Sequence, residues 1–308
     1  MTRAIVFPGQ GSQAVGMLAD LYETSETVKD TFKEASEALG YDVWALVSQD
    51  AEGKLNQTEY TQPALLTASV AIWRDYIAKG GERPSLLAGH SLGEYSALVC
   101  AGVLSLTDAV RLVQKRGQYM QQAVPAGTGA MAAIIGLDDD LVKKACDDAA
   151  QGDVVAPVNF NSPGQIVIAG QKEAVERAMS LAKEAGAKRA LALPVSVPSH
   201  CALMKPAAEQ LAKDLEQLEF NPPVISVVNN VDVAQPQAPE SIKEALVKQL
   251  YSPVRWTETI VEFGKLGVTE VIEFGPGKVL TGLGKRIDKS MNYSAANDVD
   301  SVAATLAE

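Results

Sequence analysis

Apolar and polar positions divide the chain into short apolar runs and longer amphipathic segments. The runs at 4–7 and 268–274 predict buried strands, and a further strand is expected at 224–228. In the segment 24–40, apolar residues recur three or four positions apart, which predicts a helix buried on one face. The same spacing or an Ala-rich composition predicts helices at 62–79, 106–123, 204–218, 241–250, 257–266, 279–287 and 299–307. Strands that alternate with helices indicate an α/β fold with a mostly parallel sheet covered on both faces.

The middle of the chain has a different order of elements. Here the pattern predicts strand 131–135, helix 138–150, strands 154–160 and 165–169 separated by a turn at 161–164, helix 172–186 and strand 189–193. This βαββαβ order is that of the ferredoxin-like unit. We therefore expect a small domain at 125–197, inserted into a larger domain formed by 1–124 and 198–308.

The segment with the clearest chemistry begins at an apolar strand and continues as Gly89-His90-Ser91-Leu92-Gly93. This G-x-S-x-G pattern is typical of a nucleophile elbow, in which a sharp turn between strand and helix exposes a serine hydroxyl. The alternative is an ordinary turn in which Ser91 caps the following helix. The apolar run before the motif and the Ala- and Leu-containing segment after it favour the elbow.

A serine nucleophile requires a base, and the chain contains only two histidines. His90 precedes Ser91 on the strand, so its side chain is expected to point to the opposite face. This leaves His200 as the candidate base, although a lone histidine is more often structural. No carboxylate stands out as the third member of a triad, so a backbone carbonyl is an alternative means of orienting the imidazole.

Two further features suit acyl chemistry. The Leu92 N–H follows the nucleophile directly, and the glycine-rich loop around Gln10 offers a second backbone donor for an oxyanion hole. Arg116 lies in the predicted helix 106–123, and its planar guanidinium is suited to binding a carboxylate with two parallel hydrogen bonds. The alternatives are a plain tight turn for the loop and a solvated helix arginine for Arg116.

Composition excludes several classes of function. The net charge of −11 argues against general nucleic-acid binding. No apolar run approaches the roughly 20 residues of a membrane span, and the N-terminal apolar run is too short for a signal peptide. The three cysteines are scattered, which favours reduced thiols and a cytoplasmic location. With two histidines and no paired-cysteine spacing, we expect no metal site.

At this point several motifs together resemble one family, the bacterial malonyl-CoA:acyl carrier protein transacylases of type II fatty acid synthesis. The similarity extends almost from end to end. It is carried by Phe7-Pro8-Gly9-Gln10-Gly11-Ser12-Gln13, Thr61-Gln62-Pro63-Ala64, Gly89-His90-Ser91-Leu92-Gly93-Glu94, Arg116-Gly117, Pro198-Ser199-His200, Asn229 and Gly275-Pro276-Gly277. The resemblance implies an α/β-hydrolase-like core with an inserted ferredoxin-like domain.

The resemblance also implies roles for individual residues. It assigns Ser91 as the acylated nucleophile, His200 as the base, the backbone of Gln10 and Leu92 as the oxyanion hole, Arg116 as the ligand of the malonyl carboxylate and the Gln249 carbonyl as the group that orients His200. In related polyketide acyltransferases, a glutamine after the nucleophile accompanies methylmalonyl selection. Leu92 at this position resembles the malonyl type.

The mechanism implied is a ping-pong transfer from malonyl-CoA to the phosphopantetheine thiol of acyl carrier protein. A coenzyme A thioester is then the substrate, and no permanently bound cofactor is expected. A thioesterase or esterase that uses water as the acceptor is one alternative. A non-catalytic domain that binds carrier protein is another.

Carrier proteins of this kind are strongly acidic, and this chain is acidic as well. Local basic residues near the mouth of the active site are therefore expected to overcome the net repulsion. Two pairs are candidates, Lys188 with Arg189 in the small domain and Lys285 with Arg286 in the large one. The alternative for either pair is a solvated face with no partner.

Overall fold

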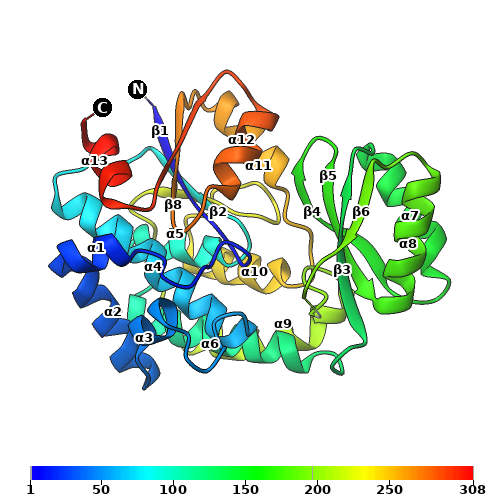
Figure 1. Cartoon of the computed structure of the whole chain (residues 1–308), viewed down its shortest axis with the longest axis horizontal. Helices are drawn as coiled ribbons and strands as arrows, with labels where there is room; N and C mark the ends of the chain where they lie inside the picture. Colours follow the sequence, from blue (N-terminus) through cyan, green and yellow to red (C-terminus); the bar gives the residue numbers. More distant parts are fainter. Residues whose placement is uncertain (1, 196, 308) are drawn as a thin grey trace.

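Two separate sheets organise the chain in the computed structural model, which describes residues 2–195 and 197–307 (Figure 1). The larger sheet has five parallel strands in the order β7-β2-β1-β8-β9. They are β1 (Arg3–Phe7), β2 (Leu86–Gly89), β7 (Ser226–Val228), β8 (Glu270–Phe274) and β9 (Asn292–Ala296). The predicted parallel sheet is confirmed.

Both faces of the parallel sheet are buried, because its strands are apolar at consecutive positions. In β1, Ile5 and Phe7 pack into one core and Ala4 and Val6 into another. The first core includes helices α2 (Glu26–Leu39), α4 (Thr58–Ala78), α5 (Gly93–Cys100), α6 (Leu106–Gln122), α9 (Lys205–Glu216) and α10 (Pro239–Gln249), and the second includes α11 (Trp256–Lys265) and α12 (Val279–Ile287).

The elements not predicted from the sequence include α1 (Ala19–Thr24), α3 (Val43–Ser48) and β9. The two helices have six residues each, which is less than two turns and too short for a repeating apolar stripe. Strand β9 buries only Ala296 and lies at the edge of the sheet, so its sequence lacks an apolar run. The C-terminal helix α13 (Val299–Ala307) forms as predicted.

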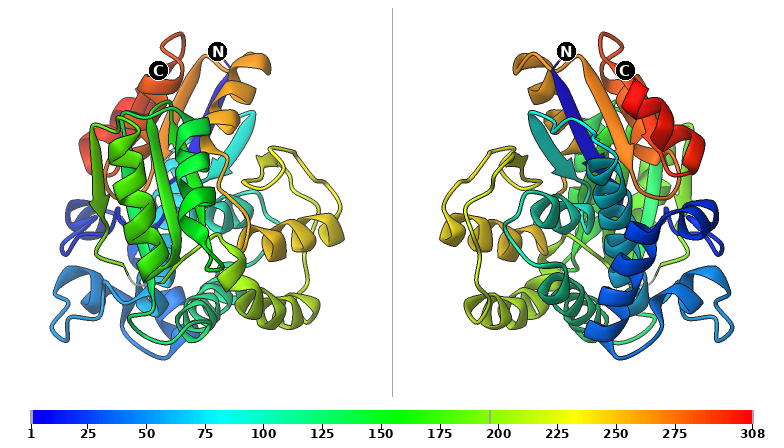
Figure 2. Two further views of the ribbon diagram at one scale, coloured as in Figure 1. Left: turned by 90° about the vertical axis from the view of Figure 1, so that its right-hand side faces the viewer. Right: turned by 90° about the vertical axis from the view of Figure 1, so that its left-hand side faces the viewer.

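The smaller sheet is antiparallel, with the strand order β4-β5-β3-β6. Its elements follow the predicted βαββαβ order: β3 (Gly129–Ile135), α7 (Asp139–Ala150), β4 (Val155–Ser162), β5 (Gln165–Gln171), α8 (Lys172–Glu184) and β6 (Arg189–Ala192). Ile134, Ile166 and Ile168 face α7 and α8, which cover one side of this sheet (Figure 2). The predicted turn at 161–164 is shorter in the structure, because Asn161 and Ser162 belong to β4.

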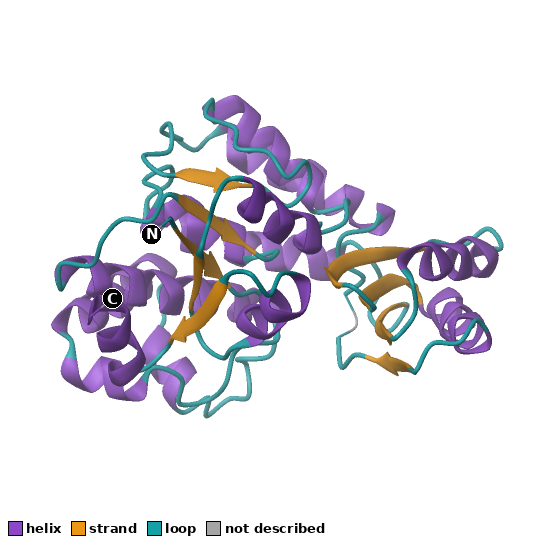
Figure 3. Ribbon diagram, turned by 90° about the horizontal axis from the view of Figure 1, so that it is seen from above, coloured by secondary structure: helices purple, strands orange, loops and turns teal. Residues whose placement is uncertain are grey.

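The other face of the small sheet is turned toward the larger part of the molecule (Figure 3). Val158 and Val167 pack there against Cys201, which follows His200 in the chain. Backbone hydrogen bonds also join the two parts: Val254 N–H donates to the Val158 carbonyl at 2.8 Å, and Phe160 N–H donates to the Val254 carbonyl at 3.0 Å. The small sheet is thereby held beside the segment that carries His200.

In the described ranges 2–195 and 197–307, no helix combines the length and the apolar character needed to cross a membrane.

Candidate active site

Ser91 lies in a strained turn directly after β2. Its φ of 52° is in the left-handed region, which a residue with a side chain rarely adopts. The turn is tight because two glycines approach other backbone closely: a Cβ on Gly89 would overlap Gly93, and one on Gly93 would overlap Phe7. Only glycine fits at either place, so the G-x-S-x-G spacing follows from sterics.

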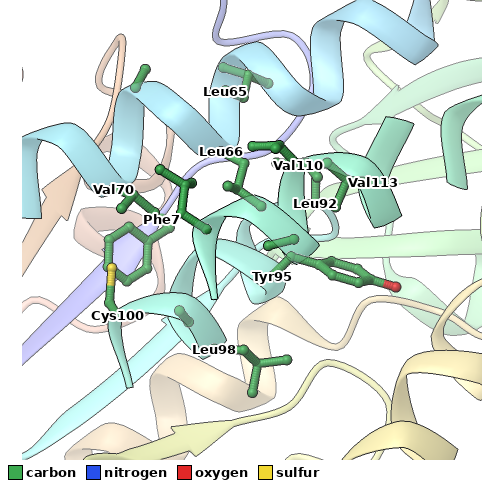
Figure 4. Close-up of a cluster of buried hydrophobic side chains, with 14 of the residues drawn as sticks. Phe7, Leu65, Leu66, Val70, Leu92, Tyr95, Leu98, Cys100, Val110 and Val113 are labelled. Carbon is green, nitrogen blue, oxygen red and sulfur yellow. The ribbon is translucent and has the colours of Figure 1, made fainter. Parts of the chain in front are cut away.

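Helix α5, which follows Ser91, is anchored in the larger core (Figure 4). Leu92, directly before α5, lies beside Val110 and Val113 of α6, and Leu66 of α4 and Phe7 of β1 belong to the same buried cluster. This anchoring fixes the start of α5 and therefore the position of the serine. Leu92 is the N-cap residue, where backbone N–H groups have no partner within the helix.

The structure brings Ser91 and His200 together although 109 positions separate them. Ser91 Oγ lies 2.7 Å from His200 Nε2, and His200 Nδ1 lies 2.7 Å from the carbonyl oxygen of Gln249. Because a carbonyl only accepts hydrogen bonds, Nδ1 must carry the proton and Nε2 is left with its lone pair toward the serine hydroxyl. This is the tautomer that a general base requires.

Burial keeps this imidazole neutral. The pKa of His200 is lowered to about 3, mainly because the imidazole is removed from water and secondly because the positive charge of Arg116 is nearby. The backbone of His200 also has a φ of 62°, and its backbone N–H donates to the Leu250 carbonyl at 3.1 Å. Ser91 and His200 thus both have a strained backbone conformation of the kind that recurs at functional sites.

Gln249 offers its carbonyl because it is the last residue of α10. The last four carbonyls of a helix have no partner within the helix, so this oxygen is free to accept from His200 Nδ1. His90 is turned the other way. Its Nε2 is 2.7 Å from Asn161 Oδ1 and its ring centroid is 5.6 Å from that of Trp256.

Arg116 is 1% exposed, which rules out the alternative of a solvated helix arginine. A Cβ on Gly117 would lie 2.7 Å from Glu59 Cα, so glycine is what lets α6 approach α4 this closely. Arg116 Nη1 then donates to Gln62 Oε1 at 2.8 Å. Its Nη2 donates to Gln249 Oε1 at 2.9 Å and lies 3.5 Å from Ser91 Oγ.

The charge of Arg116 has no carboxylate within salt-bridge distance among residues 2–195 and 197–307. Its Nε is buried with no hydrogen-bond partner among these residues. Burial lowers the pKa of Arg116, although arginine stays charged in proteins. A buried cation with spare donors beside a nucleophile is suited to an anionic ligand.

A cavity of about 830 Å³ opens above these groups. Ser91, His200, Arg116, Gln10 and Leu92 all line it, so the structure gathers five of the residues singled out in the sequence around one space. The N–H groups of Gln10 and Leu92 donate no hydrogen bond to another residue in the described part of the chain. Both are therefore available to a ligand oxygen.

The four basic residues considered for docking do not line this cavity. Arg189 pairs with Ile135, which pairs with Gln165, and Arg286 Nη1 donates to Gln165 Oε1 at 2.8 Å. Cavity-lining Met131 is four residues from Ile135 along β3, or roughly 13 Å. Arg189 of the small sheet and Arg286 of α12 thus both lie at the end of that sheet away from Met131.

Sequence reasoning missed the positions of three polar residues around Ser91. Asn230 Oδ1 accepts from Ser91 N–H at 2.8 Å and its Nδ2 donates to the Gly89 carbonyl at 2.7 Å. Glu94 and Gln62 lie in motifs that carried the resemblance, yet only the structure shows that they surround Arg116 and Gln249. Asn229, which belonged to that resemblance, instead accepts from Asp232 and Ala234 N–H in the turn after β7.

Serine, neutral histidine and unpaired arginine in one cavity are the groups that transfer of an acidic acyl group requires. The family model described as "Acyl transferase domain" matches residues 4–304. The chain belongs to this acyltransferase family.

Similar proteins narrow the assignment. The malonyl CoA-acyl carrier protein transacylase of Escherichia coli K12 is 62% identical over 303 residues, which cover 98% of each chain. An acyl carrier protein S-malonyltransferase from Vibrio cholerae has a TM-score of 0.97 and 68% identity, with 99% of each chain covered. A malonyl-transacylase solved with a type II PKS acyl-carrier protein has a TM-score of 0.99 and 61% identity, and covers 100% of this chain and 99% of its own. The resemblance predicted from the motifs, to the malonyl CoA-acyl carrier protein transacylases, is confirmed.

Proposed function

We propose that this protein transfers the malonyl group from malonyl-CoA to the phosphopantetheine thiol of acyl carrier protein, in fatty acid biosynthesis. The observation that carries the proposal is the buried, unpaired guanidinium of Arg116, which lies 3.5 Å from Ser91 Oγ. A neutral acyl group would leave this charge without a partner, whereas a malonyl carboxylate supplies one.

In the first half-reaction, Ser91 Oγ attacks the thioester carbonyl while His200 Nε2 takes the hydroxyl proton. The carbon–sulfur bond then breaks, and the proton returns from His200 to the departing coenzyme A thiolate. The oxyanion that forms between these steps is bound by the N–H groups of Gln10 and Leu92. The Gln249 carbonyl holds the imidazole in the required tautomer throughout.

In the second half-reaction, His200 takes the proton of the phosphopantetheine thiol. The thiolate attacks the malonyl-serine ester, the bond to Ser91 Oγ breaks, and the serine oxygen recovers the proton from His200. Leu92 fits the malonyl type because it stands where related polyketide acyltransferases that select methylmalonyl groups have a glutamine.

For the fold, the proposal is an α/β-hydrolase-like catalytic domain at 1–124 and 198–308 with a ferredoxin-like domain inserted at 125–197. The support is the parallel order β7-β2-β1-β8-β9 with the nucleophile after β2, and the antiparallel order β4-β5-β3-β6 with both helices on one face. Coenzyme A enters as a thioester substrate, no cofactor stays bound, and the reaction takes place in the cytoplasm.

Incubation with malonyl-CoA labelled in its acyl group tests the proposal. Wild-type protein is expected to hold label on Ser91 and to pass it to added carrier protein, whereas Ser91→Ala takes up none and unfolds at a similar temperature. Label released as malonate would instead identify a hydrolase. Absence of labelled Ser91 in the folded wild type would identify a binding domain and overturn the proposal.

For docking, we propose that carrier protein contacts Lys188, Arg189, Lys285 and Arg286. The double variant Lys285→Glu, Arg286→Glu is expected to raise the KM for carrier protein and to slow its association most at low salt, because a rim charge acts on the on-rate. Malonylation of Ser91 by malonyl-CoA should change much less. Steady-state kinetics in both half-reactions measure the difference.

The matched control is Lys143→Glu, Lys144→Glu, which makes the same change of charge on the exposed side of α7. It is expected to leave the KM for carrier protein near the wild-type value. Equal effects of the two double variants would show that only net charge matters and that the basic residues are not a docking site.

A further inference from the structure

Behind Ser91, buried polar side chains form one connected network. Gln249 is at its centre, because its Oε1 accepts from Arg116 Nη2 at 2.9 Å while its Nε2 donates to Glu94 Oε2 at 3.0 Å. The same Nε2 donates to the Ser91 carbonyl at 3.0 Å. Glu94 is held in turn by Asn230 N–H, which donates to Oε2 at 2.9 Å. Glu94 is 2% and Gln249 1% exposed, so water does not satisfy these groups.

The orientation of the Gln249 amide follows from its neighbours. On its nitrogen side lie three acceptors: Glu94 Oε2, the Ser91 carbonyl and, at 3.4 Å, Asn230 Oδ1. On its oxygen side lies the guanidinium of Arg116, which can only donate. A flipped amide would face acceptor with acceptor and donor with donor, so the acceptors around Nε2 are what keep Oε1 toward Arg116.

We propose that Glu94 and the side-chain amide of Gln249 are positioning residues that hold Arg116 toward the acyl group on Ser91 and so set the preference for a negatively charged acyl group. This inference rests on the proposed function. It assigns two separate roles to Gln249, because the backbone carbonyl contacts His200 and the side chain contacts Arg116. The two roles are separable by a substitution that changes only the side chain.

The role of Glu94 requires an acceptor oxygen rather than a negative charge. Burial raises the pKa of Glu94 to about 7, against the opposing effects of its hydrogen bonds and of Arg116. The charged groups that influence it are Arg116 on α6 and Asp232 after β7. A protonated Glu94 retains a carbonyl oxygen, and so does glutamine at this position. Glu94→Gln is therefore the conservative variant.

The experiment compares acylation of Ser91 by malonyl-CoA and acetyl-CoA in the full chain, as the ratio of the two kcat/KM values. Glu94→Ala and Gln249→Met are each expected to lower the malonyl-to-acetyl ratio at least tenfold, because Arg116 loses its fixed position. Gln249→Met preserves volume, so it keeps the test available where Glu94→Ala folds poorly. Glu94→Gln should keep the ratio within about threefold of wild type.

A double-mutant cycle gives a readout that a merely structural role would not move. Glu94 and Gln249 act on Arg116 through one path, so Glu94→Ala combined with Gln249→Met should lower the ratio little further than either change alone. Independent, additive losses in the ratio would contradict the inference.

Glu273 supplies the matched control. It is another fully buried glutamate, on β8, whose carboxylate accepts from Leu280 and Thr281 N–H rather than from the network around Arg116. Glu273→Ala, the same truncation as Glu94→Ala, should leave the malonyl-to-acetyl ratio at the wild-type value. The rate at which Ser91 reacts with phenylmethylsulfonyl fluoride, a neutral reagent, measures the reactivity of the Ser91–His200 pair separately from the binding of a charged acyl group.

The inference is overturned if Glu94→Ala and Gln249→Met slow malonyl and acetyl transfer by the same factor. That result would show that the two residues stabilise Ser91 or the fold rather than set the acyl-group preference. It is also overturned if the ratio does not change, or if Glu94→Gln loses as much as Glu94→Ala. A wild-type protein that takes up no malonyl label fails the proposed function instead, so the two failures are distinguishable.

Discussion

Replacing His200 with alanine is expected to slow malonylation of Ser91 by about 10²–10⁴-fold, because general-base catalysis typically contributes that factor. In the proposed mechanism, the Nε2 lone pair, 2.7 Å from Ser91 Oγ, accepts the hydroxyl proton. Rapid-quench measurement of labelled acyl-enzyme gives the rate of this step directly. The thermal unfolding midpoint of the variant shows whether the fold is retained.

His90→Ala is the matched control, since it removes the other histidine of the chain. The Nε2 of His90 is hydrogen-bonded to Asn161 in the small sheet. Loss of the His90 side chain should therefore lower the thermal unfolding midpoint more than the rate of Ser91 acylation. Comparable losses of acylation rate in the two variants would show that the assignment of the base is wrong.

The same base has a pH signature. Because the pKa of His200 is lowered to about 3, the neutral form persists well below the ordinary histidine value of 6.5. The rate of Ser91 acylation should therefore stay nearly constant from about pH 8 to 5 and fall only as pH approaches the lowered pKa. Loss of half the rate near pH 6.5 would indicate a solvated, ordinary histidine as the base.

Arg116→Ala is expected to cost about 2–5 kcal/mol in kcat/KM for malonyl-CoA, which is about 30- to 4,000-fold, because a charged hydrogen-bonded partner of the carboxylate is lost. Acetyl-CoA should gain relative to malonyl-CoA, since a neutral acyl group no longer leaves a buried cation unpaired. Competition between the two labelled thioesters for Ser91 measures this ratio.

Arg116→Lys should restore the preference only in part. A lysine carries the charge but lacks the planar fork that reaches Gln62, Gln249 and a carboxylate together. An unchanged malonyl-to-acetyl ratio in Arg116→Ala would show that the buried guanidinium supports the fold rather than the substrate.

Features of the fold and the site could be predicted from the sequence where residues close together in the chain restrict one another sterically or share one apolar pattern. Gly89 and Gly93 flank Ser91 because the turn between β2 and α5 leaves no room for a Cβ, and that steric condition is visible as a spacing. The βαββαβ order was predictable for a similar reason, since each element has its own apolar period. His200 was found by elimination, because the composition offers only one other histidine.

Other parts of the site depend on segments that are distant in the chain. The carbonyl of Gln249 has no sequence signature, because every residue has a carbonyl and only the end of α10 beside His200 makes this one special. Sequence spacing also gave no indication that Asn230 bonds the backbone of Ser91.

By itself, the sequence indicated the candidate nucleophile, its strained turn, the candidate base and the two kinds of sheet. Only the tertiary structure decided that Arg116 is a buried cation rather than a solvated one, because its exposure depends on how closely α6 approaches α4 at Gly117. It also decided that Gln249 bonds Arg116 behind the serine and links it to Glu94. The physical reason is that steric and periodic constraints act between neighbours in the chain, whereas burial and charge pairing depend on which distant segments pack together.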